Sequence, residues 1–186
     1  MPNSLLLLIN MHEDIFEKIE IPEGIEVTLD KSLKIKGPKG EVEREFQIEI
    51  IKDGQNIIIE KKNGTKKDKK MIKTTAAHVK NMIFGVKEGY EYLLQVCSVH
   101  FPITVTATKD FLNIKNFLGE TRERKSKILP NTQVKIEGDI IKITSPDKEA
   151  AGQTAANLET ATKIKNRDRT RFQDGIWIIQ KANKEI

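Results

Sequence analysis

The chain contains an internal repeat with an offset of 79 residues, which takes Gly40 to Gly119. Leu33–Glu41 and Leu112–Glu120 share the pattern L-x-I-K, followed after three residues by a Gly-Glu pair. The triplets Thr-Ala-Ala that begin at Thr75 and Thr154 are separated by the same offset. Because two separate matches share one offset, we infer two tandem units of similar fold. Each unit of about 75–80 residues has a small core, so we expect the two to pack against each other.

Each unit shows short alternating strands followed by one helix. Apolar and polar residues that alternate, with glycine-containing turns between the runs, predict β-hairpins. Apolar residues that recur every three or four positions predict a helix. In the first unit we expect strands at Ile25–Leu29, Leu33–Lys36, Phe46–Ile51 and Asn56–Lys61, and a helix over Thr74–Gly85. In the second we expect strands at Tyr92–His100, Phe101–Thr106, Phe111–Lys115, Val134–Glu137 and Ile140–Thr144. A helix should follow Ser145-Pro146, with Ser145 as its cap and Pro146 as its first residue.

These elements predict an α+β fold made of two tandem similar domains, each a small antiparallel sheet packed with one helix. We place an N-terminal extension at 1–20, the first repeat at 21–91, and the second at 92–186 with a basic C-terminal segment. The extension contains the apolar run Ser4–Ile9, and Met11 is a possible alternative start.

Composition excludes several classes of protein. No apolar run approaches the ~20 residues of a membrane span, and Leu5–Ile9 is too short for a signal-peptide core. The single cysteine, Cys97, excludes an internal disulfide framework and a multi-cysteine zinc site. Aromatic residues make up 5%, which argues against a protein that stacks single-stranded bases. We find no nucleotide-binding loop and no catalytic or metal-ligating constellation, and we expect no cofactor and no small-molecule substrate.

Charge is distributed unevenly along the chain. The net charge of +5 divides into −6 for residues 1–60, +9 for 61–130 and +2 for 131–186. Lys61–Lys73 carries seven lysines and one aspartate, and Lys163–Arg171 carries five cations and one aspartate. For the lysine run, a solvated loop and a phosphate-binding loop are equally good interpretations. The second cluster favours nucleic acid, because forked guanidinium groups suit phosphate oxygens.

A third basic stretch, Asn116–Lys127, combines a turn with four cations. Phe117 and Leu118 should be buried, whereas an extended backbone would put Arg122 and Arg124 on one side. A solvated edge strand is the alternative interpretation of this stretch.

Several segments resemble the large-subunit ribosomal protein family numbered six, in its archaeal and eukaryotic branch. The second half contributes Asn116–Glu120, Ser145–Asn157, Lys163–Asp168 and Phe172–Ile176; the first contributes Gly37–Gly40 and His78–Gly85. The resemblance covers about Ile21 to Gln180.

The resemblance implies a duplicated α+β fold without catalytic activity. It also implies binding to large-subunit ribosomal RNA, mainly through the second domain, near the sarcin–ricin loop and the factor-binding region, with neighbouring ribosomal proteins as further partners. The location would be cytoplasmic, in the large subunit. Charge and resemblance together make the RNA-binding candidates Lys115, Asn116, Arg122, Arg124, Lys125, Lys127, Gln153, Lys163, Lys165, Asn166, Arg167, Arg169 and Arg171. Two alternatives stay open: a free RNA-binding regulator, and a tandem protein-interaction module whose charge serves solubility.

Overall fold

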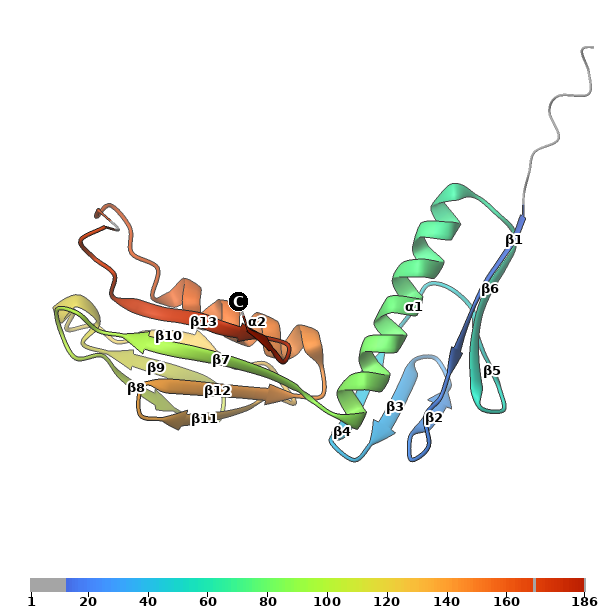
Figure 1. Cartoon of the computed structure of the whole chain (residues 1–186), viewed down its shortest axis with the longest axis horizontal. Coiled ribbons are helices and arrows are strands. Elements are labelled where there is room, and N and C mark those ends of the chain that lie inside the picture. Colours follow the sequence, from blue (N-terminus) through green and yellow to red (C-terminus); the bar gives the residue numbers. More distant parts are fainter. Residues whose placement is uncertain (1–12, 169, 186) are drawn as a thin grey trace, which may run out of the picture.

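Two similar α+β domains follow one another along the chain, as the repeat predicts (Figure 1). The structure is a computed structural model that describes residues 13–168 and 170–185. Each domain contains two small antiparallel sheets and one long helix that packs against them. The predicted fold class is therefore confirmed.

The first domain is built from six strands and helix α1. One sheet has the order β1–β6–β5 and the other the order β2–β3–β4, and α1 packs against both. Its core joins Ile19, Ile35 and Ile57 of the sheets to Ile72 and Val79 of the helix. The elements are β1 (Glu13–Glu20), β2 (Glu26–Leu29), β3 (Leu33–Gly37), β4 (Gly40–Arg44), β5 (Ile50–Asp53), β6 (Asn56–Gly64) and α1 (Lys66–Lys87).

Strand β1 corrects the expectation of an extension up to Glu20. Residues 13–20 pair antiparallel with β6, and Ile19 lies opposite Ile57 with both side chains buried. The last eight residues of the expected extension therefore belong to the first sheet. Ser4–Ile9 and Met11 lie outside the described residues. The segment Phe46–Ile51 also differs, because only Ile50 and Ile51 of it join a strand.

Helix α1 begins eight residues earlier than predicted, inside the lysine run. Thr65 caps the helix: its hydroxyl accepts a hydrogen bond from the Asp68 N–H at 3.3 Å, and its own N–H donates to the Asp68 carboxylate at 2.9 Å. Hydrogen bonds from the Thr65 hydroxyl and N–H, together with the Lys61 ammonium, hold the pKa of Asp68 far below its ordinary value. Most of the lysine run is thus the first two turns of a helix and not a loop.

The cap at Thr65 gives a first testable prediction. Replacing Thr65 by alanine should lower the free energy of unfolding by about 1 kcal/mol, because the Asp68 N–H loses its acceptor. Denaturant unfolding measures this loss. Thr74→Ala is the matched control: Thr74 is exposed on the same helix, and the change should cost less than about 0.5 kcal/mol. Equal losses in the two variants would contradict the capping role.

The second domain repeats this arrangement and adds two strands at its C-terminal end. Its sheets have the orders β11–β12–β7–β13–β14 and β10–β9–β8, and α2 packs against β7, β10, β12 and β13. The elements are β7 (Tyr90–Cys97), β8 (Thr104–Ala107), β9 (Phe111–Lys115), β10 (Arg124–Lys127), β11 (Gln133–Glu137), β12 (Ile140–Ser145), α2 (Lys148–Ala161), β13 (Gly175–Lys181) and β14 (Lys184–Glu185), with a short 3-10 turn at Phe117–Gly119.

Strands β1 and β7 occupy equivalent places in the two domains. Ile19 of β1 lies opposite the fully buried Ile57, and Leu94 of β7 lies opposite the fully buried Ile141. Strand β13 pairs with the other edge of β7, and no described strand of the first domain corresponds to it.

Helix α2 starts two residues later than predicted, with Asp147 as its cap. The Asp147 carboxylate accepts from the Glu149 N–H at 2.9 Å. The Ser145 hydroxyl instead donates to the Asn131 carbonyl at 2.8 Å and accepts from the Asp147 N–H at 3.1 Å. Ser145 therefore ends β12 and braces the turn into the helix.

The two domains meet where α1 runs into β7 (Figure 1). Gly85 of α1 lies against the backbone of Pro146, so close that a Cβ atom there would be 1.9 Å from the Pro146 carbonyl oxygen. Arg44 and His78 of the first domain both reach the Glu149 carboxylate of the second, at 2.6 and 3.2 Å. The expectation that the units pack against each other is met by this junction.

Candidate nucleic-acid interface

Two basic segments of the second domain converge on one groove. The turn after β9 and the start of β10 form one wall, and the end of α2 with the following loop forms the other. The groove has a volume of about 430 Å³. Five predicted RNA-binding residues line it, which are Arg124, Lys125, Lys163, Lys165 and Arg167.

The turn that forms the first wall is fixed by its backbone. Asn116, Leu118 and Gly119 all have positive φ, at 57°, 51° and 78°. The Asn116 side chain donates to the Pro102 carbonyl at 3.1 Å, so this amide holds the turn in place. Phe117 is buried, as predicted, and Leu118 is partly buried. These contacts fix the backbone of the turn, and the polar residues Asn116 and Glu120 are exposed on it.

Arg124 is the most tightly held cation of the groove. Its guanidinium donates two hydrogen bonds to the Glu120 carboxylate, at 2.8 and 2.6 Å, and a third to the Ala161 carbonyl at 2.8 Å. It also lies 4.2 Å from the ring centroid of Phe117. These hydrogen bonds from Arg124 hold the pKa of Glu120 below its ordinary value despite partial burial. Arg124 therefore ties the first wall to the end of α2.

Arg122 lies in a different setting from Arg124. It sits in a bend before β10, its side chain is exposed, and it makes no ion pair with any described residue. The extended segment that was expected to align the two side chains begins only at Arg124. Arg122 is consequently available to an external anion, whereas Arg124 already has three acceptors within the domain.

The remaining candidates near the first wall are exposed. Lys125 and Lys127 alternate with the buried Ser126 and so lie on the outer face of β10. Lys115 pairs with Glu123 at 3.0 Å. Gln153, in the second turn of α2, donates to the Asn157 side chain at 2.8 Å.

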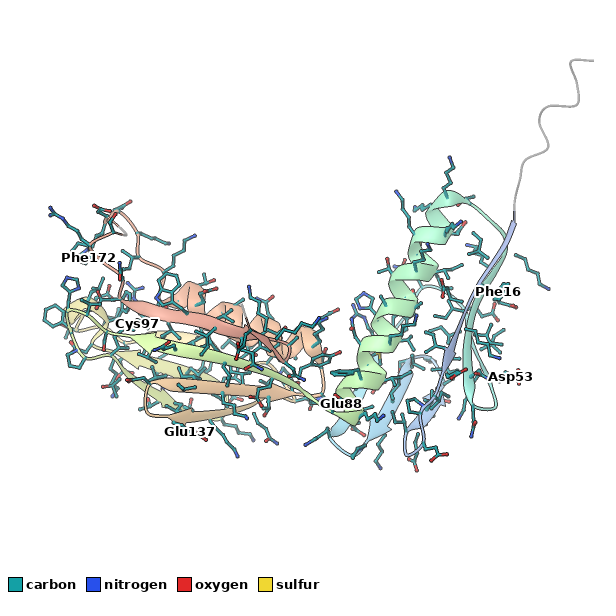
Figure 2. The ribbon with its side chains drawn as sticks, in the orientation of Figure 1. Phe16, Asp53, Glu88, Cys97, Glu137 and Phe172 are labelled. Carbon is teal, nitrogen blue, oxygen red and sulfur yellow. The ribbon has the colours of Figure 1, made fainter. Side chains whose placement is uncertain are left out.

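The loop of the second wall is held by stacked side chains. The Arg167 guanidinium lies 4.9 Å from the ring centroid of Phe172, and the His100 ring stacks on the same phenylalanine with its centroid at 4.9 Å. Figure 2 places Phe172 at the end of the domain farthest from Glu88 at the junction. Lys163, Lys165, Asn166 and Arg171 are exposed, and Arg169 lies outside the described residues.

Asp174 anchors this loop, and sequence reasoning did not single it out. Its buried carboxylate accepts from the N–H groups of Val99 and His100, at 2.8 and 2.9 Å, and lies 2.6 Å from His100 Nδ1. Burial alone would raise the pKa of Asp174, but the hydrogen bonds from His100 and Val99 hold it below its ordinary value. In the sequence, Asp174 is marked only as an aspartate within Phe172–Ile176. Its partners Val99 and His100 are 75 and 74 residues away, so no local pattern points to this contact.

Removing this carboxylate should destabilise the domain. We expect Asp174→Ala to lower the free energy of unfolding by about 2 kcal/mol or more at pH 7, since buried N–H groups lose their acceptor. Because the folded pKa is lowered, the carboxylate stabilises the fold above its ordinary pKa of 3.8, and this contribution is lost as the pH falls. The difference between the two proteins should therefore shrink below pH 4.

Thermal or denaturant unfolding between pH 3 and pH 7 measures this difference. The exposed Asp110 provides a matched control, because Asp110→Ala should change stability by less than about 0.5 kcal/mol. A constant difference across the pH range would show that the charge of Asp174 is not what stabilises the loop.

Among the described residues, no group of three or more histidine, cysteine, aspartate or glutamate side chains is placed to hold a metal ion. None of the helices over residues 13–168 and 170–185 is long and apolar enough to cross a membrane.

A duplicated fold with a basic groove and no metal cluster among its described residues is typical of a structural protein that binds a negatively charged partner. The family described as ribosomal protein L6 matches the chain twice, over residues 21–89 and 101–175. These two matches coincide with the two halves of the internal repeat.

Archaeal relatives cover most of the chain. Large ribosomal subunit protein uL6 of Methanobrevibacter smithii is 47% identical over 169 residues, which are 89% of this chain and 95% of the relative. The protein of the same name from Methanosarcina mazei is 45% identical over 92% of this chain and all of the relative. That of Sulfurisphaera tokodaii is 40% identical over 90% and 92%.

The chain therefore belongs to the ribosomal protein L6 family of the large ribosomal subunit. As a member of this family it is a structural component of the ribosome and not an enzyme. The resemblance seen in the sequence is confirmed, including its archaeal side.

Proposed function

We propose that this protein binds large-subunit ribosomal RNA through the groove between the turn at Asn116–Gly119 and the loop after α2, near the sarcin–ricin loop and the factor-binding region. The observation that carries the proposal is the convergence of two basic segments on one groove. The segments are separated by about forty residues in the sequence, yet Lys125 and Lys165 line the same groove.

The chemistry of the groove suits a folded RNA backbone. Arginine and lysine neutralise phosphates where RNA segments approach each other, and these contacts fix position without reading sequence. An A-form helix hides the base edges of its major groove, so recognition rests on shape and 2′-hydroxyls. Arg122, Lys165 and Arg167 are exposed cations that need no rearrangement to meet phosphates.

Arg124 has a different role in this proposal. Because three of its five N–H donors are engaged by Glu120 and Ala161, it positions the groove wall and contributes charge without a direct phosphate contact. Asn116 similarly positions the turn through Pro102. The other candidates, Lys115, Lys125, Lys127, Gln153, Lys163, Asn166, Arg169 and Arg171, stay predicted contacts.

The first domain has a separate place in the proposal. Residues 1–60 carry a net charge of −6, so we place this part away from RNA and toward neighbouring ribosomal proteins. We propose that the two repeats are the two domains, with β1 added to the first and the boundary between α1 and β7. The assembled particle would be cytoplasmic.

Chemical footprinting of the RNA tests the proposed location. Large-subunit RNA is probed at its 2′-hydroxyls with and without the full chain. Protection should be confined to the sarcin–ricin loop and its neighbouring helices, and should vanish when Arg122, Lys165 and Arg167 are all glutamine. Protection elsewhere, or none, would overturn the proposal and favour a protein-interaction module.

A further inference from the structure

Helix α1 of the first domain carries a row of lysines along one face. Six lysines of this helix are exposed and recur at intervals of three, four or seven positions, and these are Lys66, Lys69, Lys70, Lys73, Lys80 and Lys87. Residues at such intervals lie above one another on an α-helix, because seven positions are close to two full turns. The six side chains therefore form one continuous row, which we call the lysine stripe.

The lysine stripe lies on the side of α1 that is turned away from the core. The buried residues of the helix, among them Ile72, Val79 and Val86, pack against the sheets of the first domain, and Figure 1 shows α1 along one side of these sheets. Most of the sheet residues belong to the segment 1–60, whose net charge is −6. Helix α1 has seven lysines and one aspartate, a net charge of +6. The first domain thus separates acidic sheets from a basic helix.

No acidic side chain within residues 13–168 and 170–185 forms an ion pair with the lysine stripe. The one aspartate of the helix, Asp68, accepts from the Thr65 N–H and pairs with Lys61, which precedes the helix, at 3.0 Å. A helix face that serves only solubility normally mixes both signs, because acid–base pairs four positions apart stabilise a helix. The stripe lacks that mixture.

This arrangement destabilises the helix in the free protein. Lys66 and Lys70 are like charges four positions apart, as are Lys69 and Lys73, and such pairs oppose helix formation. Lys66 and Lys69 also lie in the first turn, where the helix dipole disfavours cations. An anion that lies along the stripe would relieve both effects. The stripe is therefore better matched to an anionic partner than to water.

The length and composition of the stripe indicate which kind of anion. From Lys66 to Lys87 the helix rises by about 32 Å, at about 1.5 Å per residue. One phosphate group cannot neutralise a row of this length, so the partner must be a chain of charges. Protein interfaces are depleted in lysine and enriched in arginine, and α1 contains no arginine. A nucleic-acid backbone needs only point charges at its phosphates, which lysine supplies.

We propose that the lysine stripe of α1 binds the phosphate backbone of a second segment of large-subunit ribosomal RNA. The proposal rests on the proposed function in one respect, since the groove of the second domain docks the chain and the stripe then meets an adjacent RNA segment. Contacts of this kind fix position without reading sequence, and they weaken as the salt concentration rises. The acidic sheets on the other side of α1 face away from this RNA.

Lysine acetylation, read residue by residue with mass spectrometry, tests for the contact. The full chain is labelled alone, in complex with protein-free large-subunit RNA, and within the intact large subunit. RNA alone should slow the acetylation of Lys69, Lys73 and Lys80 several-fold, and the intact subunit should slow it at least as much. Lys31 and Lys36 are exposed on the sheet side of the same domain and should keep their reactivity with RNA alone.

A triple variant tests whether the stripe neutralises phosphates. Replacing Lys66, Lys69 and Lys73 together by glutamine should lower the slope of log affinity for large-subunit RNA against log salt by about two units, because each lost contact accounts for about 0.7–0.9. Glutamine has nearly the helix propensity of lysine, and like-charge repulsion is removed. The free variant should therefore be at least as stable as the unchanged chain in denaturant unfolding.

The matched control removes the same charge from the sheet side of the first domain. Lys31, Lys36 and Lys39 are exposed and lie in or beside strand β3. Their triple replacement by glutamine should leave the slope within about half a unit, because they face away from the proposed RNA segment. Equal losses of slope in the two triple variants would overturn the proposal, since RNA binding would then follow net charge alone.

The labelling has its own contrary outcomes. Unchanged acetylation of the stripe with RNA and in the subunit would overturn the proposal. Shielding in the subunit but not with RNA alone would also overturn it, by identifying an acidic protein as the partner. Shielding without any loss of slope in the stripe variant would exclude phosphate contacts. The groove can fail separately: slope lost with the stripe but kept without Arg122, Lys165 and Arg167 would refute the groove and support the stripe.

Discussion

Replacing Arg122, Lys165 and Arg167 together by glutamine should weaken binding to large-subunit RNA by at least ~100-fold at physiological salt, or about 1 kcal/mol for each lost contact. All three side chains are exposed; Lys165 and Arg167 line the groove in the second domain, and Arg122 precedes Arg124 of its other wall by two residues. Each phosphate contact releases condensed counterions, so its loss should lower the slope of log affinity against log salt by about 0.7–0.9. The triple variant should therefore lose about two to three units of slope, measured by titration over a range of salt concentrations.

The control for this prediction removes the same charge elsewhere in the same domain. Lys135, Lys181 and Lys184 are exposed and lie outside the groove. Their triple replacement by glutamine should leave the slope within about half a unit, because none of them meets a phosphate. If both triple variants lost slope equally, binding would follow net charge alone and the groove would have no special role.

Replacing Gly85 by alanine should destabilise the whole chain by forcing the two domains apart at their junction. The added Cβ would meet the Pro146 carbonyl oxygen at 1.9 Å and the Tyr90 ring at 2.9 Å. Alanine is favoured over glycine in a helix by about 1 kcal/mol. Because the obstacle is backbone of the other domain, relief requires the domains to move apart, and we expect a net loss of about 2 kcal/mol or more.

Two measurements separate this effect from a general change in the helix. Denaturant unfolding gives the free energy, and amide hydrogen exchange at β4 and at the start of α2 reports opening of the junction. Lys73→Ala, on an exposed turn of the same helix, should change stability by less than about 0.5 kcal/mol. A Gly85→Ala protein as stable as the unchanged chain would mean that the junction accommodates the methyl group.

Local patterns predicted the elements whose formation depends on nearby residues. The strand Phe111–Lys115 was placed correctly, and the hairpin around Gly138-Asp139 was predicted to within a residue at either end. The alternation of apolar and polar residues and a turn glycine suffice for these elements, because each strand lies next to its partner in the sequence, with only the turn between them. Strand β1 was missed for two reasons. Its partner β6 lies about forty residues away in the sequence. In addition, the equivalent residues Ile19 of β1 and Leu94 of β7 are not 79 residues apart, so the internal repeat does not reveal the strand. Helix α1 was shortened because the lysine run hid the cap at Thr65.

The candidate site shows the same division between local and distant information. Charge density identified the segments that line the groove, but not the role of each cation. Arg122 and Arg124 are indistinguishable in the sequence, yet only Arg124 meets Glu120 and the carbonyl at the end of α2. The pairing of His100 with Asp174 joins residues 74 positions apart, and no local pattern encodes it.

Sedimentation of cell lysate on a sucrose gradient tests the central claim most directly. Fractions are probed for this chain in moderate salt and after a high-salt wash. If the protein is an integral constituent that grips ribosomal RNA through its groove, it should sediment with the large subunit in both conditions, and the Arg122/Lys165/Arg167 variant should be released by the wash. Accumulation of the unchanged chain at the top of the gradient in both salts would contradict the account.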